Sequence, residues 1–205
     1  MTKAVELAKE LLRVLEEEKA GAANIGQHEL ATLNPGEVFK IGEHDFVVLE
    51  QMEGQTAVIS KGFMAEDKQF DEESRDYNKS AIKRFIESEI QPVIEAAVGA
   101  DNLVEHDADL TSVDMQKEFE NCRCKVRLIT FDEARKYNDL IADKNIGDWW
   151  WTCTPWSTTE RGYKYSIAVV CPSGDIFSND YNNNIGVRPF CILKSNIFVS
   201  RGGQE

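Results

Sequence analysis

The chain opens on a segment whose apolar residues recur with the period of an α-helix. Within residues 2–19 they fall on one face, and Lys and Glu cover the other, which predicts an amphipathic helix. Its apolar face either packs on the chain's own domain or pairs with a second copy in a homo-oligomer, because the spacing resembles that of a short coiled coil. The residues of this face are Ala4, Leu7, Ala8, Leu11, Leu12 and Leu15.

Changes in this pattern divide the chain into three parts. We expect the helix at residues 1–20, a linker of small and polar residues at 21–34, and one domain at 35–205. The full length of 205 residues suits a single domain, and the 42% hydrophobic content is enough for a buried core.

After the linker, the apolar period shortens to that of β-strands. The runs 38–41 and 46–49 predict paired strands around a turn at 42–43, and 56–60 predicts a third strand. A β-meander is the simplest arrangement of the three. The charged residues 65–77 that follow are expected to form a loop.

A helical period returns from about Lys79. Pro92 is expected to end or kink this helix because it has no backbone N–H, so a second short helix should carry residues 93–98. The polar segment 102–121 is expected to be an irregular insertion. The inward residues of the first helix are Ile82, Phe85, Ile86 and Ile90.

A buried strand and a capped helix are predicted next. The Val, Leu and Ile residues of 125–129 indicate the strand. Thr130 and Glu133 stand at the spacing of a capping box, which opens a helix through Leu140.

The C-terminal third alternates strand-like runs with turn residues. Residues 166–171 predict an apolar strand, 172–175 a turn, and 176–178 the start of a return strand. An Asn-rich loop at 179–184 separates this strand from a closing strand at 187–193. Strands, then helices, then strands predict an α+β fold with a mainly antiparallel sheet and two or more packed helices.

Composition excludes several classes of partner. The formal charge of −13 over 205 residues argues against a nucleic-acid partner. No apolar run approaches the roughly 20 residues that span a bilayer, so membrane insertion is not expected. Charged residues near the N-terminus leave no apolar core for a signal peptide, which predicts synthesis in the cytoplasm and leaves a later place in a virion open. Those residues are Lys3, Glu6, Lys9 and Glu10.

The residues that could carry chemistry do not form an active-site pattern. The five cysteines are an odd number without a predicted leader, which favours reduced thiols. Cys122 and Cys124 lack a second Cys or His pair at the spacing of a zinc site, so we expect them to be structural. There is no Gly-x-Ser-x-Gly motif and no His after His106. We therefore expect no catalytic residue, no metal and no cofactor.

Three motifs in the C-terminal third resemble those of a known family. Residues 150–155, Trp-Trp-Thr-Cys-Thr-Pro, resemble its WWLRSP signature. Ser173 and Gly174 match its turn, and residues 185–190 resemble its NGVRPA strand. The segments 80–89 and 126–137 correspond to its upstream helix and strand-helix in order. This family is a bacterial and phage domain family of unknown function.

The resemblance covers roughly residues 35–195 and implies a fold. Such domains resemble the C-type-lectin-like fold shared with formylglycine-generating enzymes, and also the variable proteins of diversity-generating retroelements. Those systems rewrite adenine-containing codons near the C-terminus from a template rich in Asn codons, so the resemblance implies a variable region at 150–191. The chain departs from the family at 152–154, where Thr-Cys-Thr stands in place of Leu-Arg-Ser, and a role of that Arg is not carried over.

The Asn-rich loop and the Ser/Thr-rich loop before it suit ligand recognition. Asn offers both donors and acceptors, and Tyr gives a large, rigid contact area at low entropic cost. The alternative is that the Asn-rich loop is a solvated turn. The candidate ligand-binding residues are Trp156, Ser157, Thr158, Thr159, Tyr163, Tyr165, Ser178, Asn179, Tyr181, Asn182, Asn183 and Asn184.

The other conspicuous residues of this segment are expected to belong to the scaffold. Tryptophans between a helix and a strand are usually core, so Trp150 and Trp151 should be buried. Arg188, in its Gly-Val-Arg-Pro setting, should form an ion pair or bind backbone carbonyls.

We expect a non-enzymatic module that recognises a protein or glycan, as a diversified phage or prophage protein. A Glu-Pro-Asn or Gln-Pro-Asp calcium loop is absent, so sugar binding would be calcium-independent. The second interpretation is a structural or assembly component of a prophage whose Asn-rich loop binds nothing. The third is an oxidase related to formylglycine-generating enzymes, using thiols among Cys153, Cys171 and Cys191; the last two lie in apolar strands, which weighs against it.

Overall fold

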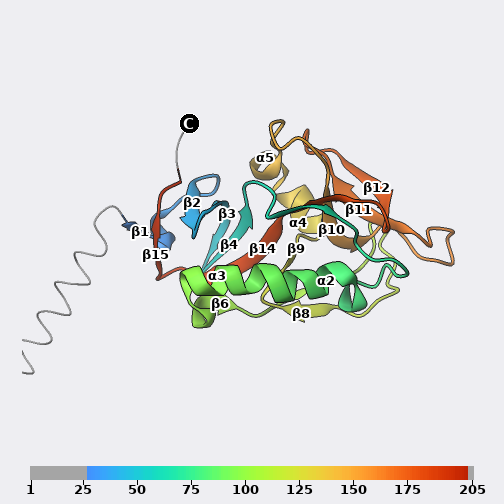
Figure 1. The fold of residues 1–205 in the computed structure, drawn as a ribbon, viewed down its shortest axis with the longest axis horizontal. Coiled ribbons are helices and arrows are strands. Elements are labelled where there is room, and N and C mark those ends of the chain that lie inside the picture. Colours follow the sequence, from blue (N-terminus) through green and yellow to red (C-terminus); the bar gives the residue numbers. More distant parts are fainter. Residues whose placement is uncertain (1–26, 203–205) are drawn as a thin grey trace, which may run out of the picture.

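The computed structural model describes residues 27–202, which form an α+β domain of mainly antiparallel sheets with few helices (Figure 1). The predicted α+β class and the predominantly antiparallel pairing are confirmed. The predicted helix at 1–20, with its two alternative roles, lies outside the described residues.

The predicted β-meander is part of a six-stranded sheet. Its strands are β2 (Val38–Ile41), β3 (His44–Met52), β4 (Gln55–Ser60), β14 (Pro189–Lys194), β6 (Leu103–Val104) and β9 (Val126–Leu128). The meander β2-β3-β4 is antiparallel, and its first turn contains Gly42 with a φ of 59°, which favours glycine. The closing strand β14 lies between β4 on one side and β6 and β9 on the other.

A second sheet has five strands and carries most of the C-terminal third. In spatial order they are β12 (Ile176–Asp180), β11 (Ser166–Val170), β10 (Trp150–Pro155), β13 (Ile185–Val187) and β5 (Ala65–Lys68). Only β10 and β13, among these neighbours, pair in parallel. β5 lies in the segment 65–77 that was expected to be a loop. Its charged sequence has no strand period, and pairing with the distant β13 makes it a strand.

The domain begins earlier than the sequence predicted. β1 (Gln27–Glu29) pairs with β15 (Phe198–Ser200), and the 3-10 turn η1 (Leu30–Thr32) follows. Leu30 and Leu33 are buried in the main core. Residues 27–34, expected to be linker, are therefore part of the domain.

The segment 102–121, expected to be irregular, contributes two short strands. One is β6, and the other is β7 (His106–Ala108), which pairs with β8 (Cys122–Cys124). The residues between β7 and β8 remain without helix or strand.

One long helix replaces the two helices predicted around Pro92. α2 (Ala81–Phe85), the π-turn η3 (Ile86–Ile90) and α3 (Gln91–Val98) run on without a break, between the 3-10 turns η2 (Tyr77–Lys79) and η4 (Ala100–Asn102). Pro92 has no N–H, and its ring would crowd the carbonyl four residues earlier. The wider π-turn accommodates both, with the Gln91 N–H donating to the Ile86 carbonyl. The buried residues of the whole helix from α2 to α3 are Ile82, Ile86, Ile90 and Ile94.

The predicted capping box opens α4 (Phe131–Lys136), which α5 (Asn138–Ile141) follows. The Thr130 hydroxyl accepts from the Glu133 N–H, and the Glu133 carboxylate accepts from the Thr130 N–H. Alternate residues of β3 belong to two different cores, one shared with α4 and α5 and the other with α2–α3. The two pairs of helices therefore pack on opposite faces of the six-stranded sheet. The unbroken apolar run of β3 thus reflects burial on both faces.

Candidate functional site

The two tryptophans of β10 lie inside the fold, as predicted. Trp151 is fully buried, its indole N–H donates to the Lys68 carbonyl at 2.8 Å, and its ring meets Phe70 edge-on at 5.7 Å. Trp150 points to the opposite face of the strand, into the core beneath α4 and α5. β10 is therefore the centre of the scaffold.

Arg188 binds carbonyls from two distant elements, which confirms its predicted structural role. Its guanidinium donates to the carbonyls of Ser60 at 3.0 Å and Ile141 at 2.8 Å, and lies over the Trp150 ring at 4.5 Å. Burial lowers the pKa of Arg188 to about 10. Next to it, Gly186 provides space for the Phe63 ring, which a Cβ at this position would approach to 2.4 Å.

The loop between β10 and β11 is held by a buried arginine. Arg75 is only 3% exposed and donates to the Ser157 carbonyl, to the Thr159 hydroxyl and to the Glu118 carboxylate. Glu118 in turn accepts from the Thr159 N–H and hydroxyl. Because a buried charge that is paired and hydrogen-bonded is costly to displace, this loop is fixed in place.

A second carboxylate holds the same loop from the outside. Asp114 accepts from the hydroxyls of Ser112 and Ser157 and from the Arg161 guanidinium. These hydrogen bonds, that of Ser112 first, lower the pKa of Asp114 to about 2. Two of the predicted ligand-binding residues, Ser157 and Thr159, therefore have partners within the chain.

The remaining residues of this loop differ in exposure. Trp156 and Thr158 are half-buried, and the Thr158 carbonyl accepts from the N–H groups of Arg161 and Tyr163. Tyr163 is 43% exposed and Tyr165 is 49% exposed. The two tyrosines are large apolar side chains presented to solvent by a loop that the scaffold holds.

Tyr181 differs from the expectation of an exposed binding residue. It is 7% exposed and belongs to the main core, where its ring lies 5.7 Å from that of Tyr165. Its carbonyl accepts from the N–H groups of Phe70 and Asp71. Tyr181 therefore fastens the turn after β12 to the segment that precedes α2.

The Asn-rich turn is partly tied by its own side chains. Asn179 is half-buried, and its Oδ1 accepts from the Asp180 N–H at 3.0 Å and from the Asn183 side chain at 2.5 Å. Ser178, Asn182, Asn183 and Asn184 are exposed.

Phe177 is a surface residue that sequence reasoning missed. It is 46% exposed, and its ring stacks on Trp149 at 5.3 Å with planes 15° apart. Its place in the run Ile-Phe-Ser predicted a strand. Only the edge position of β12 exposes its ring.

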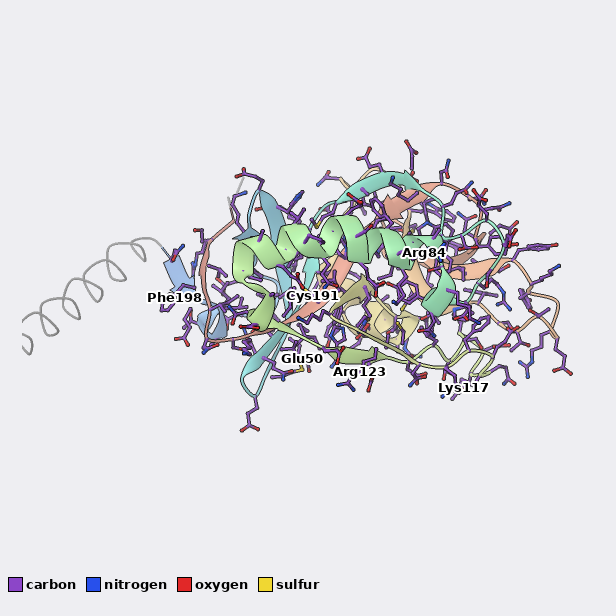
Figure 2. The ribbon with its side chains drawn as sticks, turned by 60° about the horizontal axis from the view of Figure 1, so that its bottom comes forward. Glu50, Arg84, Lys117, Arg123, Cys191 and Phe198 are labelled. Atoms are coloured by element: carbon purple, nitrogen blue, oxygen red, sulfur yellow. The ribbon has the colours of Figure 1, made fainter. Side chains whose placement is uncertain are left out.

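The thiols of the C-terminal third are buried. Burial raises the pKa of Cys153 to about 12 and that of Cys191 to about 12. Cys191 lies in the interior of the domain (Figure 2). Cys171 is also buried, with its sulfur 2.9 Å from the Ser173 hydroxyl. Thiols that stay protonated are poor nucleophiles and poor metal ligands.

The half-buried His106 has hydrogen-bond partners within the fold. Its Nε2 accepts from Arg127 and its Nδ1 faces the Val104 carbonyl at 3.0 Å. Burial, with the charge of Arg127, lowers the pKa of His106. Over residues 27–202, no group of three or more His, Cys, Asp or Glu side chains is placed to hold a metal ion. No helix in the same range is long and apolar enough to cross a bilayer.

Comparison with known proteins identifies one domain. A family model described as a domain of unknown function (DUF6273) matches residues 105–195, which run from β7 to the end of β14. The prediction that the chain carries a domain of unknown function is confirmed over this range. No curated protein and no solved structure matches the chain.

Proposed function

We propose that the protein is a non-enzymatic recognition module with a C-type-lectin-like fold, which binds a protein or a glycan through its C-terminal third. The recognition surface that we assign combines exposed aromatic and amide side chains from the β10–β11 loop, from β12 and from the turn after it. Its residues are Tyr163, Tyr165, Phe177, Ser178, Asn182, Asn183 and Asn184.

The observation that carries this proposal is the rigid support under exposed aromatic rings. Arg75, Glu118 and Asp114 hold the loop that presents Tyr163 and Tyr165. Exposed tyrosines have an apolar body that gains from being covered, and a fixed loop loses little entropy on binding.

The buried thiols weigh against the oxidase interpretation. Copper or redox chemistry on cysteine requires an accessible thiolate, and the raised pKa values of Cys153 and Cys191 oppose its formation. The structural or assembly interpretation differs from ligand recognition in one testable respect, because it assigns no ligand to the recognition surface.

Replacing Tyr163, Tyr165 and Asn182 together with Ala should abolish ligand binding and leave the melting temperature nearly unchanged, since all three side chains are exposed. Binding is measured on a glycan array and against a displayed library of random peptides. The matched control replaces Met52 and Val93, which are exposed apolar residues elsewhere, with Ala. If the wild type binds neither set, or the triple variant binds as the wild type does, the structural interpretation is favoured.

We further propose that residues 150–191 are the variable region of a diversity-generating retroelement. The neighbouring DNA should then contain a reverse-transcriptase frame and a near-copy of the segment encoding residues 151–189, with mismatches confined to adenines of the copy. Because exposed positions tolerate substitution, mismatches should fall on the recognition surface and spare Arg188 and Trp151, which are buried. Sequencing the locus tests this, and the absence of both elements would rule it out.

A further inference from the structure

β12 is the outermost strand of its sheet, with β11 as its neighbour (Figure 1). Within residues 27–202 no other strand pairs with it. Phe177, Ser178 and Asp180 on this strand are all exposed. An uncovered edge strand presents backbone donors and acceptors to solvent.

The ladder shows which backbone groups of β12 face outward. In an antiparallel pair, every second residue directs both its N–H and its C=O at the partner strand. The Tyr181 N–H donates to the Tyr165 carbonyl, and the Cys171 N–H donates to the Asp175 carbonyl. In this register Asn179 and Phe177 also face β11. Ile176, Ser178 and Asp180 therefore direct their backbone groups away from the sheet.

One of these three residues is already satisfied within the chain. The Asp180 N–H donates to the Asn179 side chain, and the Asp180 carbonyl accepts from the Asn183 N–H. The Asn-rich turn thus occupies the outward backbone groups at the C-terminal end of β12. The stretch Ile176–Ser178, which we call the free edge, keeps its outward N–H and C=O groups.

The side chains around the free edge add two features. The side chain of Phe177, in the middle of the free edge, stacks on Trp149 and gives an exposed apolar surface. Asp175 and Asp180 are exposed at its two ends, about 17 Å apart at the usual rise of a strand. The surroundings therefore favour an apolar residue at the centre of a bound segment and basic residues toward its ends.

We propose that the free edge binds an extended segment of a partner protein as an added β-strand, apolar at its centre and basic toward its ends. This inference rests on the proposed recognition function and narrows its ligand to a peptide strand. A row of alternating N–H and C=O groups is complementary to another extended backbone, and a glycan offers no such row. A second copy of the chain is disfavoured because each copy carries a net charge of −13.

The test uses a displayed library of random twelve-residue peptides, selected on the wild-type protein. The variant Ser178→Pro removes an outward N–H and no bond to β11, so it should fold. Ser178→Thr is the matched control, because it changes the side chain and keeps the N–H. Selected peptides should bind Ser178→Pro at least about tenfold more weakly than Ser178→Thr.

Amide exchange of the wild type provides an independent readout, which does not depend on how the proline variant folds. The N–H groups of Ile176 and Ser178 should exchange quickly in the free protein and become protected when a selected peptide is bound. The inference is overturned if no peptide is selected, if the proline and threonine variants bind equally, or if these amides stay unprotected. Should a glycan bind instead and be lost in the Tyr163, Tyr165 and Asn182 variant, the recognition function would stand without the added strand.

Discussion

Arg127→Met should lower the free energy of unfolding by about 3–5 kcal/mol. Arg127 is 1% exposed and forms a bidentate ion pair with Glu133, in which Nη1 donates to Oε2 at 2.7 Å and Nη2 donates to Oε1 at 2.6 Å. It also donates to the Leu128 carbonyl and to His106, and its guanidinium lies 4.2 Å from the centre of the Phe190 ring. Met can fill much of the volume but leaves the Glu133 carboxylate without its counter-charge. Urea unfolding measures the loss.

The control for this variant is Arg135→Met on the same helix. Arg135 and Asp132 form an ion pair whose side chains are 70% and 71% exposed, so its loss should cost less than about 1 kcal/mol. If Arg127→Met costs no more than Arg135→Met, the buried pair contributes nothing beyond a surface pair.

The cost of Arg127→Met should also depend on pH. Burial raises the pKa of Glu133, but the hydrogen bonds and charge of Arg127 outweigh it and hold the pKa below its usual 4.5. A carboxyl group with a lowered folded-state pKa stabilises the fold above the unfolded-state pKa, and this contribution is lost as the pH falls. The difference in free energy of unfolding between wild type and variant should therefore be full at neutral pH and shrink as the pH falls below about 4.5.

Tyr181→Ala should destabilise the protein by about 3 kcal/mol, although its neighbours in sequence form an exposed turn. The side chain is 7% exposed within the main core, and its removal leaves a cavity beside Tyr165. Thermal and urea unfolding report the loss. The outcome separates a scaffold residue from a ligand-binding residue within one short segment.

Tyr165→Ala is the matched control for Tyr181→Ala, because the two rings are in contact and only one is buried. Tyr165 is 49% exposed, so its replacement should cost less than about 1 kcal/mol. Equal losses for the two variants would contradict the assignment of Tyr181 to the scaffold and Tyr165 to the recognition surface.

The structure exposes some residues of the predicted candidate site and buries others. Tyr163, Tyr165, Ser178 and Asn182–Asn184 are exposed, as a recognition surface requires. Ser157 and Thr159 are bound by Asp114 and Glu118, which lie in the segment 102–121 that the sequence predicts to be an irregular insertion. Its acidic and hydroxyl side chains offered no local signal of their partners, because Glu118 meets Thr159 only after the chain has folded.

The sequence by itself determined the elements whose signals are local. These are the strands of the meander, the capping box of α4, the burial of Trp150 and Trp151, and the α+β class, because periodicity and capping act between residues close along the chain. Tertiary structure alone decided that the charged β5 is a strand and that Tyr181 points inward. It also decided that β12 is an edge with free backbone groups. The first two depend on residues far along the chain, β13 for β5 and Phe70 and Asp71 for Tyr181. The third depends on the fact that, within residues 27–202, no strand pairs with the outer side of β12. No local pattern specifies these arrangements.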